Sequence, residues 1–261
     1  MRSLNIAATG MLAQQLNVEV ISNNIANMNT TAFKRQRAEF QDLLYQEQER
    51  VGSTSSDTGT IVPAGIQIGV GVKTAAVYRI TEQGNLVSTS NTYDVAIQGK
   101  GFFSITLPNG DTAYTRAGSF QLSPDGTIVT TDGYNVSPGI TIPSDAIAVT
   151  INPSGEVLAK IQSSITPQNV GQFTLVNFPN EAGLAPIGDN LFLETPASGA
   201  SIAGTPGTNG YGTILQGFLE TANVNVVQEV TNLITAQRAY EMNSKVIEAS
   251  DEMMRSLTQM R

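Results

Sequence analysis

Apolar residues recur every seven positions near the start of the chain. Two rows show this spacing: Leu4, Met11, Val18 and Ile25 in one, and Ala7, Gln14, Ile21 and Met28 in the other. Because seven of these eight positions are apolar and no proline interrupts them, the pattern predicts a coiled-coil-like helix over residues 4–28. Asn and Thr side chains compete for backbone hydrogen bonds, so we expect the helix to end within residues 27–31.

The same spacing returns at the other end of the chain. One row contains Val226, Leu233, Tyr240, Ile247 and Met254, and a companion row on the same face contains Ala236, Asn243, Ser250 and Leu257. Neither Pro nor Gly occurs between residues 224 and 257, so the pattern predicts a second long helix there.

Between these helices the pattern changes to short runs of β-branched and aromatic residues. We expect strands within residues 94–103, 112–122, 127–131, 146–151, 156–161 and 173–178. Asn109-Gly110, Asp125-Gly126 and Asp132-Gly133 are typical of tight hairpin turns. Turn signals about 8–12 residues apart are typical of a sandwich or barrel.

These elements predict an α+β, mainly β fold with a long loop arm. We expect residues 1–30 and 224–261 to pair as a helical assembly domain. Residues 31–91 form a connecting region, whose Gly-rich and Ser-rich part at about 46–72 predicts an extended loop. Residues 92–223 are expected to form a β-rich outer domain that includes a glycine-rich return segment.

Each predicted helix carries an apolar stripe that a lone helix cannot bury in water. The two helices can cover each other as an antiparallel pair, or the stripes can pack against other copies of the chain. Residues 3–18 contain no charged side chain, although a solvated helix face normally carries Lys and Glu. This favours packing between subunits. The expected interface residues are Leu4, Met11, Val18, Ile21, Ile25, Met28, Val226, Leu233, Tyr240, Ile247, Met254 and Leu257.

The chain of 261 residues contains neither His nor Cys, which removes several kinds of chemistry. Ser-His-Asp and Cys-His nucleophiles, His-based zinc sites and disulfides are excluded. Asp125 and Asp132 leave a hydrolase with two carboxylates as an alternative, but Asp before Gly is typical of a turn. We therefore expect no enzymatic activity, no cofactor and no metal.

The acidic charge lies in the middle of the chain. Residues 92–220 contain three Lys or Arg and ten Asp or Glu, whereas the net charge of the whole chain is −8. This disfavours nucleic acid as a partner, because phosphate contacts need clustered cations. No apolar stretch approaches the length of a membrane span, and the N-terminus lacks the apolar core of a secretory signal. A secreted β-rich adhesin or carbohydrate-binding module would need such a signal and an exposed aromatic platform, and neither is evident.

Three long motifs resemble the bacterial flagellar rod and hook protein family. They are residues 21–35; residues 94–97 with 101–103 and 114–120; and residues 217–225 continuing to 236–241. The resemblance covers both ends and the middle of the chain in the expected order. The matching residues are Asn23, Asn24, Asn27, Phe33, Lys34, Asp94, Gly101, Phe102, Arg116, Gly118, Phe120, Gln237, Arg238, Tyr240 and Glu241.

Within the family, the length and residues 63–72 resemble the distal rod subunit, with another axial subunit (proximal rod or hook) as the alternative. Pro63, Gly65, Gly69 and Gly71 then belong to a rod-specific loop. Ala32 stands where the family commonly has Gly. Because Ala does not adopt a positive φ cheaply, this argues against the bend that Gly would allow.

The resemblance implies a structural subunit of the bacterial flagellum. It implies polymerisation with other copies into a rigid helical tube that transmits motor torque to the hook and lines the export channel. The implied partners are other rod subunits, the hook protein, the surrounding P and L ring proteins and the flagellar type III export apparatus. The implied location is the basal body from periplasm to outer membrane, reached without a cleaved signal peptide.

Overall fold

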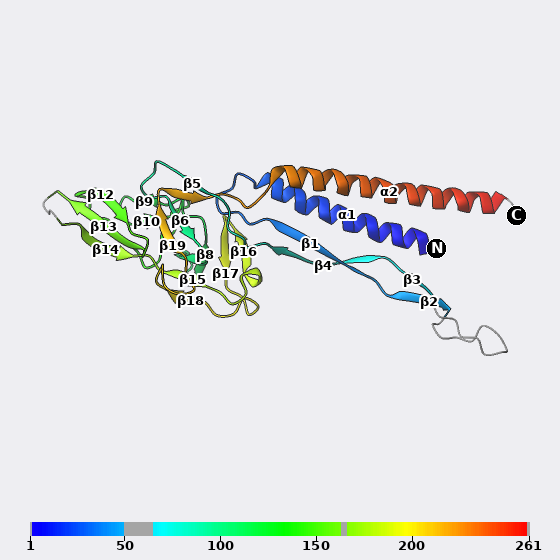
Figure 1. The fold of residues 1–261 in the computed structure, drawn as a ribbon, viewed down its shortest axis with the longest axis horizontal. Coiled ribbons are helices and arrows are strands. Elements are labelled where there is room, and N and C mark those ends of the chain that lie inside the picture. The colour runs from blue at the N-terminus through cyan, green and yellow to red at the C-terminus, as the bar shows by residue number, and fades with distance from the viewer. Residues whose placement is uncertain (1, 50–64, 163–165, 260–261) are drawn as a thin grey trace. The chain divides into compact units, whose positions relative to one another are not determined.

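The computed structural model describes residues 2–49, 65–162 and 166–259 (Figure 1). The chain divides into two compact units. The first takes the described residues among 1–26, 36–78 and 225–261, and the second takes those among 27–35 and 79–224. Each unit is therefore built from segments that lie far apart in the sequence.

Two long helices, α1 (Arg2–Ala26) and α2 (Val226–Gln259), lie side by side in the first unit (Figure 1). They run in opposite directions, since Ser3 meets Ser250 whereas Asn24 meets Glu229. This confirms that the two helices pair, whereas α1 ends at Ala26, one residue before the segment 27–31 in which its end was expected. The side chain of Asn225 caps α2 by accepting the N–H of Gln228 at 3.3 Å.

The same unit contains two pairs of strands. The strands β1 (Gln36–Asp42) and β4 (Val72–Arg79) form one pair. The strands β2 (Tyr45–Glu49) and β3 (Ile66–Gly69) form an antiparallel pair in which Tyr45 lies opposite Gly69. Among the residues of the predicted loop, Pro63 lies outside the described residues and Gly65 immediately precedes β3.

The strand Val72–Arg79 is held against α1 by a close approach at Gly71. Its φ is +132°, and a Cβ at this position would overlap the hydroxyl of Thr9. The same hydroxyl accepts the N–H of Val72 at 3.4 Å. Gly71 is thus required both by its backbone angle and by its neighbour.

The second unit is built almost entirely from short strands. In chain order they are β5 (Leu86–Ser88), β6 (Val95–Gln98), β7 (Phe102–Thr106), β8 (Thr112–Thr115), β9 (Gln121–Leu122), β10 (Ile128–Val129), β11 (Asn135–Val136), β12 (Ala146–Ile151), β13 (Glu156–Ile161), β14 (Gln168–Gln172), β15 (Leu175–Asn177), β16 (Ala185–Gly188), β17 (Leu191–Leu193), β18 (Ile202–Gly204), β19 (Thr213–Gln216) and β20 (Phe218–Glu220). A short 3₁₀ helix, Glu181–Gly183, precedes β16.

The largest sheet has nine strands, ordered β16-β17-β8-β7-β11-β10-β9, with β15 and β18 joined through β7. A three-stranded sheet follows the order β12-β13-β14, and two further pairs are β6 with β19 and β5 with β20. The α+β, mainly β class is confirmed, and β12 and β13 have the predicted bounds.

All three predicted hairpin turns are present. Gly110, Gly126 and Gly133 have φ angles of +88°, +78° and +84°. They lie between paired strands: β7 and β8, β9 and β10, and β10 and β11. Asp125 and Asp132 therefore stand at turn positions, which accounts for them without any catalytic role.

Aromatic packing fills the centre of the second unit. The ring of Phe103 lies 5.2 Å from that of Phe120 and 5.9 Å from that of Phe173, both in edge-on contact. The apolar core around them consists of Val95, Ile97, Ile128, Val136, Ile140, Ile142, Ile151, Val157, Leu175 and Ile214.

Ala32 adopts a φ of +57°, so the bend argued against from the sequence is formed. Its N–H donates to the carbonyl of Glu220 at 2.8 Å, and the residue is buried. Holding Ala in this region costs about 1 kcal/mol, which the surrounding contacts offset.

The motif residue Gly118 is required for a different reason. A Cβ added here would overlap the carbonyl oxygen of Val95, whose N–H donates to the carbonyl of Gly118 at 2.9 Å. Two backbones therefore pass too close to each other for any side chain.

We expect Gly118→Ala to destabilise the protein by about 3 kcal/mol or more, because neither backbone can move away cheaply. Gly110→Ala is the control: a Cβ there meets nothing within 4 Å, and the positive φ costs about 1 kcal/mol. Urea unfolding followed by circular dichroism measures both variants. Equal losses of stability would contradict the backbone clash.

Candidate functional site

Small and polar residues form one line of contact between the two helices. A seam of Ser3, Gly10, Asn17 and Asn24 on α1 follows a spacing of seven. Ser3 lies 3.4 Å from Ser250 between hydroxyl oxygens, Gly10 packs on Asn243, and Asn24 bonds Glu229 at 3.3 Å. Each step along α1 is matched by an equal step back along α2, so one register holds along the whole seam.

On α2, the seam residues Asn243 and Ser250 belong to the companion row recognised in the sequence, whereas on α1 the seam differs from the apolar rows. Leu4, Met11, Val18 and Ile25 each follow a seam residue by one position, about 100° further round the helix, and remain partly exposed. Small side chains allow closer contact between helix backbones, which is why they occupy the centre. The row of Leu4 therefore borders the helix contact, whereas Ala7 and Ile21 of the second row are buried.

The outer surface of α2 carries an uncharged apolar patch, which we call the α2 patch. It consists of Val226, Val227, Val230 and Ile234, and Val227 is 77% exposed. Glu229 lies in the same turn but is buried toward α1 at 5% exposure. Further along, exposed Tyr240, Met242, Val246, Met253 and Met254 alternate with charged side chains.

The predicted interface residues fall into several classes of exposure. Ile21 is buried, whereas Leu233 and Ile247 are partly exposed, like the row on α1. Val226, Tyr240 and Met254 are exposed, and Met28 is exposed beyond the end of α1. The position of Leu257 is part of α2, but its side chain lies outside the described residues. Their role as subunit contacts stays a prediction.

A cleft of about 530 Å³ lies along the helix pair. It is lined by Gln15, Val18, Glu19, Gln237, Tyr240 and Glu241. Three residues of the C-terminal motif thus surround it, while Arg238 is exposed one position away.

In the second unit, three motif segments meet at a buried charge cluster. Glu220 Oε1 lies 2.6 Å from Lys34 Nζ, and Glu220 Oε2 lies 2.9 Å from Arg116 Nε. The N–H of Gly84 also donates to Glu220 Oε1 at 2.9 Å. All three charged side chains are buried, with Glu220 at 1% exposure.

The remaining donors of the cluster hold nearby backbone. Lys34 Nζ donates to the carbonyl of Glu82 at 2.8 Å, and Arg116 donates to the carbonyls of Gly99 at 2.8 Å and Gly101 at 3.1 Å. The two cations are therefore bonded on several sides, as a buried charge requires.

The cluster changes the pKa values of its members. Burial acts to raise the pKa of Glu220, but the charges of Arg116 and Lys34, with hydrogen bonds from Lys34 and Gly84, lower it overall. Burial lowers the pKa of Lys34, and the charge and hydrogen bond of Glu220 oppose part of this effect.

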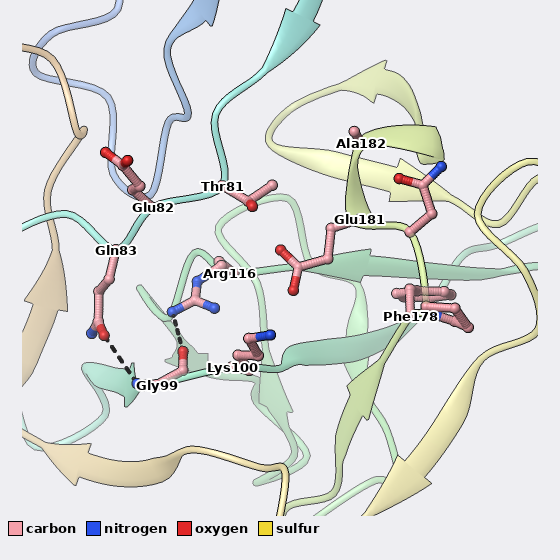
Figure 2. A pocket seen from close by; sticks show the side chains of 11 residues that line it. Thr81, Glu82, Gln83, Gly99, Lys100, Arg116, Phe178, Glu181 and Ala182 are labelled. Atoms are coloured by element: carbon pink, nitrogen blue, oxygen red, sulfur yellow. Dashed lines mark hydrogen bonds between the residues drawn. The ribbon is translucent and has the colours of Figure 1, made fainter.

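A cleft of about 550 Å³ opens beside this cluster (Figure 2). Its walls come from residues 81–83, 99–100 and 178–182, and Arg116, the residue after β8, also lines it (Figure 2). Gln83 Oε1 accepts the N–H of Gly99 at 3.0 Å across the wall. Arg116 uses its donors on Glu220 and on backbone carbonyls, so it holds the walls together.

The other motif residues also serve the fold. Asp94 is buried and accepts the hydroxyl of Thr89 at 2.7 Å and the amide of Asn91 at 2.9 Å. Phe102 packs edge-on against Phe178 at 5.9 Å.

Backbone geometry explains several more of these positions. Gly101 has a φ of +136°, and the carbonyl of Phe33 accepts the N–H of Asn223. Asn27 Oδ1 accepts the hydroxyl of Thr30 at 3.1 Å, and Asn23 is exposed on the last turn of α1.

Sequence reasoning placed Glu220 within the motif of residues 217–225 without giving it a role, and it missed Glu229, Val227 and Val230. Val227 and Val230 lie outside the rows that repeat every seven residues, so the repeat did not identify them as interface residues. Glu220 is separated by 186 residues from Lys34, and Glu229 by 205 residues from Asn24. Such distant pairing leaves no local signal.

Two absences concern the described residues. Neither helix has the combination of length and apolar character that crossing a membrane demands, within the part of the chain that is described. Among residues 2–49, 65–162 and 166–259, no group of three potential ligands could hold a metal ion.

Three family models match this chain. They are described as Flagella basal body rod protein over residues 4–34, Flagellar hook protein FlgE/F/G D1 domain over residues 96–159, and Flagellar basal body rod FlgEFG protein C-terminal over residues 215–260. These segments overlap the three motif regions recognised from the sequence.

Curated relatives match along the whole length. The chain is 61% identical to the flagellar basal-body rod protein FlgG of Caulobacter vibrioides, with 100% of both chains covered. It is 56% identical to FlgG of Agrobacterium fabrum over 97% of each chain, and 49% identical to FlgG of Buchnera aphidicola over 99% of each.

We expect Glu220→Gln to destabilise the protein by about 3–5 kcal/mol at neutral pH, since it leaves two buried cations without their carboxylate. Because the folded-state pKa of Glu220 is lowered, its stabilisation is present above its ordinary pKa of 4.5 and is lost as the pH falls through the folded value. The variant should therefore show a shallower loss of stability below pH 4.5.

Glu82→Gln is the matched control, because Glu82 pairs with Arg35 at 3.9 Å on the surface. It should cost less than about 1 kcal/mol. Urea unfolding between pH 3 and pH 7 measures both variants. Parallel pH curves for Glu220→Gln and the parent protein would disprove the role of this carboxylate.

Proposed function

Because this chain belongs to the flagellar basal-body rod protein family, we propose that it is a structural subunit of the distal rod that polymerises through its helix pair. The observation on which this proposal rests is the exposed α2 patch. Four apolar side chains without a charge among them stand on the outside of a helix whose other side is already covered. Such a surface is typical of a contact with another protein.

Another copy of the chain is the partner that best fits this patch. A contact between different surfaces of identical subunits does not close on itself and generates a filament. Burying the patch would contribute about 25 cal/mol per Å² of apolar area, repeated at every subunit. The predicted interface residues that border the seam would join the same contact.

The second unit fits the role of a firm outer domain. Its aromatic core and buried charge cluster hold many short strands in one arrangement. In a tube of such subunits, this rigidity would help to transmit torque to the hook, while the helix pairs would line the export channel. The paired strands β2 and β3, which lie almost entirely within the predicted rod-specific loop, would add contacts between neighbours.

The finer partners and location are part of the same proposal. Other rod subunits, the hook protein, the P and L ring proteins and the type III export apparatus are the proposed partners. The proposed location is the basal body between periplasm and outer membrane, reached without a cleaved signal peptide. The role is structural, and the turn positions of Asp125 and Asp132 support the absence of catalysis.

We expect Val230→Glu to abolish rod assembly and motility, because it places a charge in the α2 patch that the contact would bury unpaired. Gln228→Glu is the matched control: it adds the same charge in the same turn, outside the patch. Electron microscopy of isolated basal bodies and swimming assays measure assembly. Normal rods with Val230→Glu would rule out the patch as the contact surface.

A further inference from the structure

The side-chain amide of Asn24 joins three elements of the first unit. Its Oδ1 accepts the N–H of Gln36 at 2.8 Å, and its Nδ2 donates to the carbonyl of Gln36 at 2.8 Å. The same Nδ2 lies 3.3 Å from Glu229 Oε2. Gln36 begins β1, and Glu229 lies in the first turn of α2. Asn24 is 1% exposed, so these bonds are made away from water.

The apolar rows cannot define the register of the helix pair by themselves. Both helices repeat every seven residues, so a slip by seven again places apolar rows beside apolar rows. Such a slip moves one helix by about 10 Å along the other. The seam residues Ser3, Gly10 and Asn17 are small or polar and oppose this slip only weakly.

Asn24 and Glu229 do oppose the slip. Moving the helices by seven residues in one direction places Asn24 opposite Ala236 and carries Glu229 beyond the end of α1. The opposite slip carries Asn24 beyond the start of α2. Either way the buried amide and carboxylate lose each other, and an unsatisfied buried polar group is costly. A single buried polar pair can select one register in this way.

We propose that Asn24, acting through Glu229, specifies the register of the helix pair. The register fixes how far α2 extends beyond the start of α1 and where the α2 patch stands along the pair. If the proposed function holds, Asn24 is therefore a positioning residue for assembly, although it contributes no surface to the contact.

Disulfide trapping measures the register of the helix pair directly. Because the chain contains no Cys, only the introduced cysteines can form a disulfide. Ser3→Cys is combined with Ser250→Cys, Asn243→Cys or Leu257→Cys in the full-length chain. The hydroxyl oxygens of Ser3 and Ser250 are 3.4 Å apart, so the first combination reports the observed register. The other two report a slip by seven residues in either direction. Intramolecular disulfides of the dilute purified chain are quantified on non-reducing gels.

We expect the parent background to give mainly the disulfide between positions 3 and 250. Asn24→Ala should lower the ratio of this disulfide to the two slipped ones by about tenfold or more. Glu229→Leu should act in the same direction, whereas Glu229→Gln keeps an oxygen acceptor and should preserve the ratio.

Asn17→Ala is the matched control. Asn17 is the seam asparagine one heptad earlier, and its amide lies 3.5 Å from Gln14 of its own helix. Asn17→Ala removes the same side-chain atoms as Asn24→Ala. The ratio of the disulfide between positions 3 and 250 to the two slipped disulfides should nevertheless change by less than about twofold. An unchanged ratio in Asn24→Ala would overturn the proposal and assign the register to the chain connections. A parallel fall of all three disulfides would also overturn it, because Asn24 would then stabilise the pair without selecting a register.

The outcome of this experiment is independent of the outcome of the assembly test of the proposed function. Val230→Glu should keep the disulfide between positions 3 and 250, because the patch faces away from the seam. Normal rods with Val230→Glu would rule out the α2 patch as the contact surface and leave the trapping ratios intact. A preserved register in Asn24→Ala would end this inference and leave the assembly role of the patch intact.

Discussion

A carboxylate removed from water needs compensating charge, and this requirement organises the second unit. Glu220 meets it with Lys34, Arg116 and the N–H of Gly84, which come from three separate parts of the chain. An apolar replacement of the whole cluster could be equally stable, but removing one member would leave charge buried and unpaired. The cluster therefore ties these segments to one another more strictly than apolar packing does.

The first unit is closed by the same kind of contact. Asn24 and Glu229 are 205 residues apart in the chain, and Lys34 and Glu220 are 186 residues apart. In both units a polar group from the early part of the chain is satisfied by an acid from the late part. Neither unit is complete until both parts are in place, so contacts of long sequence separation must form during folding.

Local patterns predicted the elements well, because their causes are local. The seven-residue repeats predicted both helices, and the Asp-Gly and Asn-Gly pairs predicted the three hairpin turns. The companion row predicted the α2 side of the seam, Asn243 and Ser250, but no row predicted Ser3 and Gly10 opposite them. Ala32 adopts its positive φ because distant contacts hold it there. The partners of Glu220 and Asn24 depend on tertiary structure, which no local signal reports.

The helix pair differs from an ordinary two-helix coiled coil, because polar side chains lie in the contact and apolar ones remain on the outer surface of α2. An apolar seam with a charged exterior would satisfy a lone chain and leave little reason to associate. Here the small and polar seam residues accompany buried Ala7, Ala13 and Ile21, while Val227 and its neighbours remain in water. The contact between α1 and α2 thus contributes more to the relative direction and register of the helices than to apolar burial. The α2 patch leaves apolar area that a single chain does not cover, which is the physical condition that the proposed assembly requires.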